Sequence, residues 1–140
     1  MYMFVYGTLK SGFGNNRLLQ TSEFIGDATT DRPYLLTDCG FPFASETGNK
    51  LLPVMGEVYR VDDPTAQQRI DGLEGHPNFY ERKQVPVTMT ASGVQIPGCW
   101  MYLVPEQTAG RYGLCPITKG HFKWRHQVDT GAPAHEHLLQ

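Results

Sequence analysis

The sequence is poor in cysteine, in long apolar runs and in clustered basic residues, and each shortage excludes a class of protein. Its three cysteines, Cys39, Cys99 and Cys115, form no C-x-x-C pair, so we expect buried thiols and no disulfide framework or zinc knuckle. No segment approaches the roughly 20 apolar residues that span a bilayer, and no basic leader is present. The formal net charge is −2, which gives no reason to expect nucleic acid or a membrane as a partner. We expect a cytoplasmic protein with a small-molecule or protein partner.

Metal and nucleotide motifs are also missing. His121 and His126 lie five residues apart, and His135 and His137 lie in a polar tail. Neither spacing matches a standard metal-ligand pattern. The chain has no G-x-G-x-x-G, P-loop or lipase-elbow sequence, which leaves little support for dinucleotide or phosphoryl-transfer chemistry. We therefore expect no bound metal.

What is present suits one globular domain of the α+β class. The 140 residues are 40% hydrophobic and 19% charged, as is usual for a single domain with a core. Strand-like segments with turn residues between them are predicted over 3–6, 23–28, 34–37, 41–45, 53–61, 84–91 and 94–104. The last two flank "ASGV" and predict a hairpin. Gly56, inside the segment 53–61, indicates a bulge or a close backbone approach.

One clear helix is predicted, together with shorter helical segments. In "DDPTAQQRIDGLEGHP", Asp63 can cap the helix and Pro64 suits its first position. One-face spacing predicts that the apolar residues Ala66, Ile70 and Leu73 are buried, and Gly75 and Pro77 end the helix. A short helical turn is expected over 15–20, and another over 118–127 with Phe122 and Trp124 inward. We expect the domain to cover 1–128 and a polar, flexible tail to cover 129–140.

The opening stretch "MFVYGTLK" predicts a buried strand that ends at Gly7. A glycine there lets the backbone approach a neighbouring group, because it has no Cβ. The loop that follows has two interpretations. Its backbone N–H groups hold an anion, or the loop simply turns the chain.

Glu74 is the candidate that chemistry alone singles out. It falls in the last turn of the predicted helix, where the negative end of the helix dipole opposes a carboxylate. If Leu73 and Phe79 also desolvate it, its pKa rises toward neutrality and it becomes able to take and return protons. The alternative is a solvated glutamate at a helix end.

Several other residues compete for a catalytic or binding role. Asp71 lies three residues before Glu74, so the two carboxyls are also candidates for an acid pair. His76 is a possible base and Cys115 a possible nucleophile, although neither has a recognisable sequence context. The basic side chains of Arg82 and Lys83 either bind a substrate carboxylate or are solvated.

Three ordered blocks carry a family resemblance over residues 2–104: "FVYGTLK", "GEVYRVDD" and "IDGLEGHPNFYER". Together they resemble the γ-glutamylcyclotransferase-like superfamily, and within it the γ-glutamylamine cyclotransferase branch. The resemblance implies a small single α+β domain with a mixed barrel-like β-sheet, a few short helices and a cavity at one end of the sheet. It implies no cofactor, and we expect a monomer or a weak homodimer.

The resemblance also assigns roles to residues. It implies that Tyr6, Gly7, Thr8 and Leu9 grip the γ-glutamyl part of a substrate and that Glu74 is the catalytic general acid/base. Tyr102 in "CWMYLV" resembles a tyrosine that lines the pocket, although an aromatic residue in a strand is equally well a core residue. The implied reaction is the attack of a substrate's α-amine on its own γ-carbonyl, which releases 5-oxoproline and a free amine or amino acid. The alternative is an inactive binding or regulatory module of the same fold, and the leaving group stays open.

Overall fold

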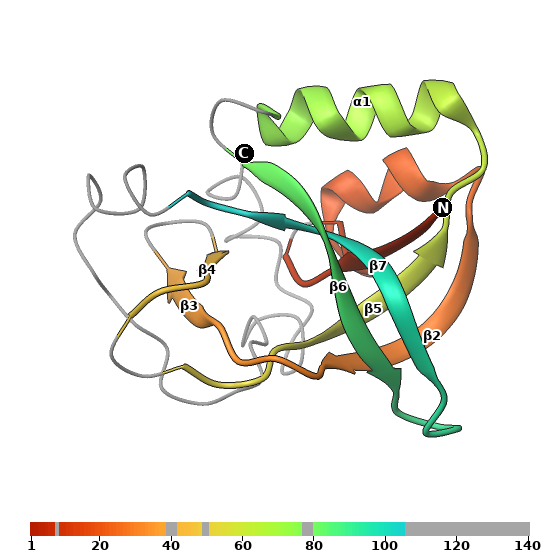
Figure 1. Cartoon of the computed structure of the whole chain (residues 1–140). Helices are drawn as coiled ribbons and strands as arrows, with labels where there is room; N and C mark the ends of the chain where they lie inside the picture. Colours follow the sequence, from red (N-terminus) through yellow and green to blue (C-terminus); the bar gives the residue numbers. More distant parts are fainter. Residues whose placement is uncertain (8, 39–41, 49–50, 77–79, 106–140) are drawn as a thin grey trace.

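The computed structural model describes residues 1–7, 9–38, 42–48, 51–76 and 80–105, and its centre is a closed β-barrel (Figure 1). The barrel order is β1-β5-β2-β6-β7, and β3 and β4 form a separate two-stranded sheet. The β1–β7 pair is parallel and the other barrel pairs are antiparallel, so the predicted mixed, barrel-like α+β fold is confirmed. The strands are β1 Tyr2–Val5, β2 Glu23–Thr30, β3 Leu35–Asp38, β4 Pro42–Ser45, β5 Met55–Arg60, β6 Glu81–Met89 and β7 Gln95–Leu103.

The opening strand is apolar along its whole length because both of its faces are buried. Phe4 packs inside the barrel with the cluster that includes Val58 and Met101. Its neighbours Met3 and Val5 point to the outside, where they pack in a second cluster with Ile70 of the helix. Successive strand residues point to opposite faces, so a strand with two buried faces shows no polar alternation.

Gly56 marks a close backbone approach and no bulge. A Cβ at this position would lie 2.4 Å from the Val5 carbonyl oxygen of the adjacent strand β1. The β2–β5 pairing is regular on either side of Gly56. Register shifts occur elsewhere, between Phe24 and Gly26 on β2 and between Val85 and Val87 on β6.

The helix α1, Pro64–Glu74, lies across the outside of the barrel (Figure 1). Asp63 caps it as predicted, because its Oδ1 accepts a hydrogen bond from the Thr65 N–H at 2.9 Å. Ala66 and Ile70 are buried, but the prediction for Leu73 is wrong, since this side chain is 39% exposed. The apolar stripe ends one turn early, and partly buried acidic residues occupy the last turn instead.

The structure tests some of the remaining local predictions, and the others concern residues outside the described ranges. The turn over 15–20 is the 3-10 helix η1, Gly14–Leu19, and the β6–β7 hairpin forms around Gly93, whose φ is 73°. Cys99 is buried, and burial raises the pKa of its thiol to about 12. Cys39, Cys115, the helix predicted over 118–127 and the tail over 129–140 lie outside the described residues. No helix in the described part has the length and apolarity needed to cross a membrane.

Candidate active site

The structure brings the loop after β1 next to the end of α1. Tyr6 is buried, and its hydroxyl donates to the carbonyl oxygen of Tyr102 at 2.8 Å. The same hydroxyl accepts a hydrogen bond from the Ala44 N–H at 3.0 Å. Burial and the nearby charge of Glu74 raise the pKa of both Tyr6 and Tyr102. Three of the predicted site residues therefore lie close enough for the charge of one, Glu74, to affect the other two, Tyr6 and Tyr102.

Glu74 is the last residue of α1 and is held by the way this helix ends. Gly75 adopts the left-handed conformation, and its N–H bonds to the Gly72 carbonyl while the His76 N–H bonds to the Asp71 carbonyl. This is a Schellman motif, which needs glycine for its positive φ of 66°. The Tyr80 N–H then bonds to the Glu74 carbonyl at 3.3 Å. The backbone on both sides of Glu74 is thus fixed.

The Glu74 carboxyl group is partly buried without a compensating partner among the described residues. Desolvation raises its pKa to about 7, in the predicted direction. No described residue donates a hydrogen bond to this carboxyl group or forms an ion pair with it. The predicted source of desolvation was wrong in part, because Leu73 points to solvent, and Phe79 lies outside the described residues.

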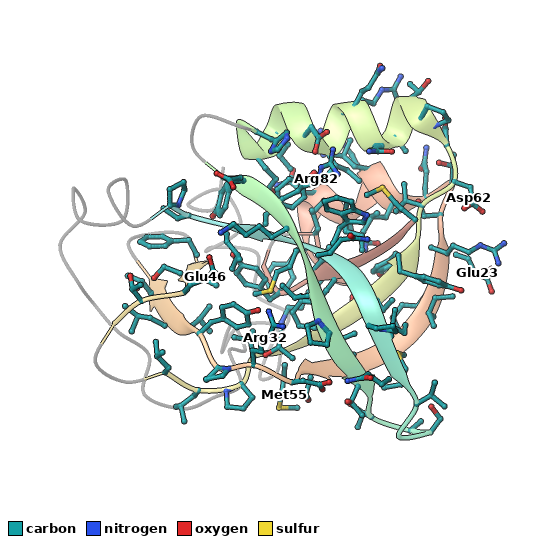
Figure 2. The ribbon with its side chains drawn as sticks, in the orientation of Figure 1. Glu23, Arg32, Glu46, Met55, Asp62 and Arg82 are labelled. Carbon is teal, nitrogen blue, oxygen red and sulfur yellow. The ribbon has the colours of Figure 1, made fainter. Side chains whose placement is uncertain are left out.

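Asp71, one turn earlier on the same helix, has the hydrogen-bonding partners that Glu74 lacks among the described residues. Its Oδ1 accepts from Arg82 Nε at 2.8 Å and its Oδ2 accepts from Arg82 Nη2 at 3.2 Å. The Tyr102 hydroxyl also donates a short hydrogen bond to Oδ1. Asp71 is therefore ion-paired, and the hypothesis of an acid pair with Glu74 is wrong. Figure 2 shows Arg82 between β6 and α1.

His76 and Tyr102 complete this side of the site. His76 Nδ1 accepts a hydrogen bond from the Arg82 N–H at 3.3 Å, so in the neutral ring the proton is on Nε2. That assignment removes Nδ1 as a proton acceptor for a substrate. The ring of Tyr102 packs edge-on against His76 and against Tyr80. Tyr102 is 4% exposed, so it belongs to the core and to the neighbourhood of Glu74 at once.

The loop after β1 is organised by its own backbone. The Gly7 carbonyl accepts a hydrogen bond from the Lys10 N–H at 3.0 Å. Leu9 is 4% exposed and packs in the outer cluster, while its carbonyl accepts from Asn16 Nδ2 at 2.8 Å. The side chain of Leu9 is thus a core anchor. Thr8 lies outside the described residues.

Glu57 is a site residue that the sequence reasoning missed. It lies on β5 with 9% exposure, and its Oε1 and Oε2 accept from the N–H and Oγ of Ser11 at 2.8 and 2.7 Å. The Tyr59 hydroxyl donates to Oε1 at 3.2 Å. The signal was the single acid inside "VMGEVYRV", because a carboxylate in a barrel strand needs hydrogen-bonding partners.

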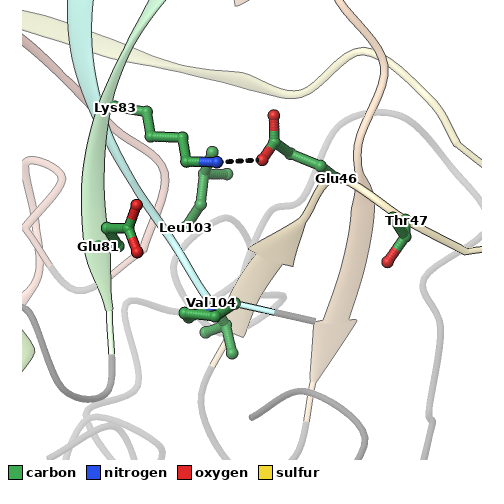
Figure 3. Close-up of a pocket in the computed structure, with 7 residues that line it drawn as sticks. Glu46, Thr47, Glu81, Lys83, Leu103 and Val104 are labelled. Carbon is green, nitrogen blue, oxygen red and sulfur yellow. Dashed lines mark hydrogen bonds and ion pairs between the residues drawn. The ribbon is translucent and has the colours of Figure 1, made fainter. Parts of the chain in front are cut away.

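A cavity of about 310 Å³ opens beside β6 (Figure 3). Its charged wall carries Lys83, whose Nζ lies 2.6 Å from Glu46 Oε1. Glu81 and Lys83 alternate with Arg82 along β6, so the cavity and Asp71 lie on opposite faces of this strand. The lining residues are Glu46, Thr47, Glu81, Lys83, Leu103, Val104 and Pro105.

Neither basic residue that was considered for carboxylate binding is simply solvated. Arg82 is paired with Asp71 and Lys83 with Glu46. Within the described ranges, no group of three or more His, Cys, Asp or Glu side chains is arranged to hold a metal ion. Among the described residues, the groups near the β1 loop include a carboxyl group with a raised pKa, an ion-paired carboxylate and two buried phenols.

Comparisons with known proteins agree with this arrangement. The family model described as gamma-glutamyl cyclotransferase, AIG2-like, matches residues 3–124. A Methanocaldococcus jannaschii protein, named provisionally as a gamma-glutamylcyclotransferase, is 42% identical over 106 residues, which cover 75% of this chain and 85% of that protein. The gamma-glutamylaminecyclotransferase of Bos taurus is 35% identical over 109 residues, covering 71% of this chain and 63% of the bovine one.

A solved structure extends the agreement to three dimensions. The crystal structure of a mouse AIG2-like protein superposes with a TM-score of 0.72 at 25% identity, covering 90% of this chain and 91% of the mouse chain. The resemblance noted from the three sequence blocks is thus confirmed by sequence and by fold. The chain belongs to the gamma-glutamyl cyclotransferase, AIG2-like family.

Proposed function

We propose that this protein is a γ-glutamyl cyclotransferase that uses Glu74 as its general acid/base. The observation that carries the proposal is the partly buried Glu74 carboxyl group, which has no ion-pair partner in the described part of the chain and a pKa of about 7. A carboxyl group with such a pKa exchanges protons readily at neutral pH. Family membership supports the reaction class, and the names of the relatives include both cyclotransferases and aminecyclotransferases.

The reaction needs one proton acceptor that later becomes a donor. The α-ammonium of a γ-glutamyl compound gives a proton to the Glu74 carboxylate, and the free amine then attacks the γ-carbonyl carbon of the same molecule. The new C–N bond closes a five-membered lactam. As the bond to the leaving nitrogen breaks, protonated Glu74 returns its proton to that nitrogen. The Glu74 carboxylate then takes the second proton from the ring nitrogen and passes it to the released amine. The products are 5-oxoproline and a free amine or amino acid, and Glu74 ends as the carboxylate.

The β1 loop suits the binding part of this proposal through its backbone. The hydroxyl of Tyr6 already has one acceptor and one donor, so Tyr6 acts by holding the loop against β7. Gly7 and Leu9 then present main-chain groups, and a substrate held in a folded conformation needs less ordering at the transition state. We assign the γ-glutamyl end of the substrate to this loop, and we place Tyr102 in the same site as Glu74.

The test is a product assay on purified protein. We would incubate the chain with γ-glutamyl amino acids and γ-glutamylamines and measure 5-oxoproline and the released amine by mass spectrometry. We expect equal amounts of both products from at least one compound. A Glu74→Gln preparation purified in parallel controls for a contaminating enzyme. Saturable binding of 5-oxoproline without any turnover would overturn the proposal and favour a binding module.

A further inference from the structure

The loop that follows β1 is attached to strand β5 at two separate points. At its far end, the N–H and the hydroxyl of Ser11 both donate to the carboxylate of Glu57, at 2.8 and 2.7 Å. Nearer its start, the Leu9 carbonyl accepts a hydrogen bond from Asn16 Nδ2 at 2.8 Å. The same amide group donates to the Tyr59 hydroxyl at 3.0 Å, and this hydroxyl donates to Glu57 Oε1 at 3.2 Å. The two attachments therefore belong to one hydrogen-bond network.

Glu57 is a firm base for this network because it belongs to the barrel wall, where β1 and β5 lie side by side (Figure 1). It pairs with Val5, the last residue of β1, so it lies opposite the point where the loop leaves the barrel. Its neighbour Val58 packs inside the barrel, while Tyr59 packs with Leu9 in the outer cluster. Glu57 is 9% exposed, and a carboxylate buried to this degree needs donors that replace its hydration. Ser11 and Tyr59 supply three such donors, so loop and strand are held together.

The main chain of the loop is folded into a turn. The Lys10 N–H donates to the Gly7 carbonyl at 3.0 Å, which closes the turn between these two residues. Among the described residues, no acceptor is present for the N–H groups of Gly7 and Leu9. Main-chain N–H groups in a turn bind an anionic group such as a substrate carboxylate, provided that their directions are fixed beforehand. The network on β5 fixes the loop from outside the turn.

We propose that Glu57 is a positioning residue that, through Ser11 and Tyr59, holds the loop after β1 in the conformation that receives the γ-glutamyl group. This inference rests on the proposed function, which assigns that group to the loop. A loop that is in the binding conformation only about a tenth of the time lowers the apparent affinity for substrate about tenfold. The loss should appear in KM, because the loop holds the γ-glutamyl group both before and during ring closure.

The kinetic test compares Glu57→Ala with a control variant that also loses stability. Val87→Ala shortens a buried side chain inside the barrel, on strand β6, and leaves the network intact. We expect the KM of Glu57→Ala for a γ-glutamyl substrate to rise about tenfold, with kcat within about threefold of the parent. Val87→Ala should keep the KM of the parent, although melting temperatures should fall in both variants. An unchanged KM in Glu57→Ala, or an equal rise in Val87→Ala, would overturn the inference.

Two milder variants grade the effect and replace Glu57→Ala if that variant does not fold. Glu57→Gln keeps one acceptor oxygen for Ser11, so it should restore part of the affinity that Glu57→Ala loses. Tyr59→Phe removes the hydroxyl that joins Asn16 to Glu57 and leaves the two bonds from Ser11 in place. We expect KM to rise in both variants, by less than in Glu57→Ala. Parental KM values in both would contradict the positioning role.

Amide hydrogen exchange tests the order of the loop without any substrate. The Lys10 N–H is the reporter, because it donates within the turn. This amide should exchange at least about tenfold faster in Glu57→Ala than in Val87→Ala, and equal rates would overturn the inference. A chain that forms no 5-oxoproline refutes the proposed function, and the Lys10 amide still decides whether Glu57 holds the loop. An active enzyme whose KM and Lys10 exchange ignore Glu57→Ala refutes only the positioning role.

Discussion

Two glutamates lie near the loop that follows β1, and their surroundings differ sharply. Glu57 on β5 accepts three hydrogen bonds, two from Ser11 and one from Tyr59. Glu74 at the end of α1 accepts none from the described residues, and burial raises its pKa to about 7. A buried carboxylate with all its partners stabilises the structure around it, whereas one without partners exchanges protons readily. We therefore expect different roles from two residues of the same type, because their hydrogen bonds differ.

The strongest test of this comparison is Glu74→Gln. The amide keeps the shape of the side chain but cannot take a proton from an ammonium group, so we expect turnover to fall on the order of 10²- to 10⁴-fold. In the parent enzyme, kcat/KM should fall on the acid side of the Glu74 pKa of about 7, because the protonated group is no base. Steady-state rates over a pH series measure both effects.

Two outcomes of the Glu74→Gln experiment would contradict the assignment. Near-normal turnover would mean that a group other than Glu74 takes and returns the proton. A large drop in thermal stability would make Glu74 a structural residue. Asp71→Asn is the matched comparison, because this carboxylate is already paired with Arg82, and it should not reproduce the full loss of turnover.

The corresponding change at the second glutamate is Glu57→Ala. This change removes the acceptor for the Ser11 N–H and for the Tyr59 hydroxyl, and a buried polar group that loses its partner costs about 1–3 kcal/mol. We expect the free energy of unfolding to fall by that amount in urea titrations. Glu57→Gln keeps one acceptor oxygen and should lose about half as much. If either variant lost turnover as Glu74→Gln does, with unchanged stability, Glu57 would belong to the chemistry.

Glu74 should also set the pH dependence of stability, with a sign opposite to that of an ion-paired acid. Its pKa is about 7 in the folded protein, against an ordinary value of 4.5 for a solvated glutamate. Between these values the folded state binds the proton and the unfolded state does not, so stability falls as pH rises through this window. Glu74→Gln removes the effect, and above the window it should be more stable than the parent by roughly 1–3 kcal/mol. A parent whose stability is flat or rises across the window would show that Glu74 is not desolvated.

Features of the fold and site that depend on residues close in sequence were predictable, and contacts between residues far apart in sequence were not. The Asp63 cap, the end of α1 at Gly75 and the two-sided burial of β1 follow from residues close in sequence, and these predictions were correct. Ser11, which donates two hydrogen bonds to Glu57, is 46 residues away from it, and Arg82 is 11 residues away from Asp71. Neither pairing follows from spacing or composition. The exposure of Leu73 was mispredicted because helical spacing cannot tell where the barrel beneath the helix ends.

The smallest expected effect concerns the other ion pair on β6. Lys83 and Glu46 are 45% and 49% exposed, compared with 15% and 21% for Arg82 and Asp71. Exposed ion pairs contribute about 0–1 kcal/mol, because water screens the charges and ordering two long side chains costs entropy. Lys83→Gln should therefore change the free energy of unfolding by less than about 0.5 kcal/mol, and even less at high salt. Urea titrations at low and high salt measure this, and kcat should stay within about twofold of the parent. A tenfold loss of kcat would mean that the cavity beside β6 takes part in the reaction. The face of β6 that carries Lys83 would then contribute to catalysis and not only to stability.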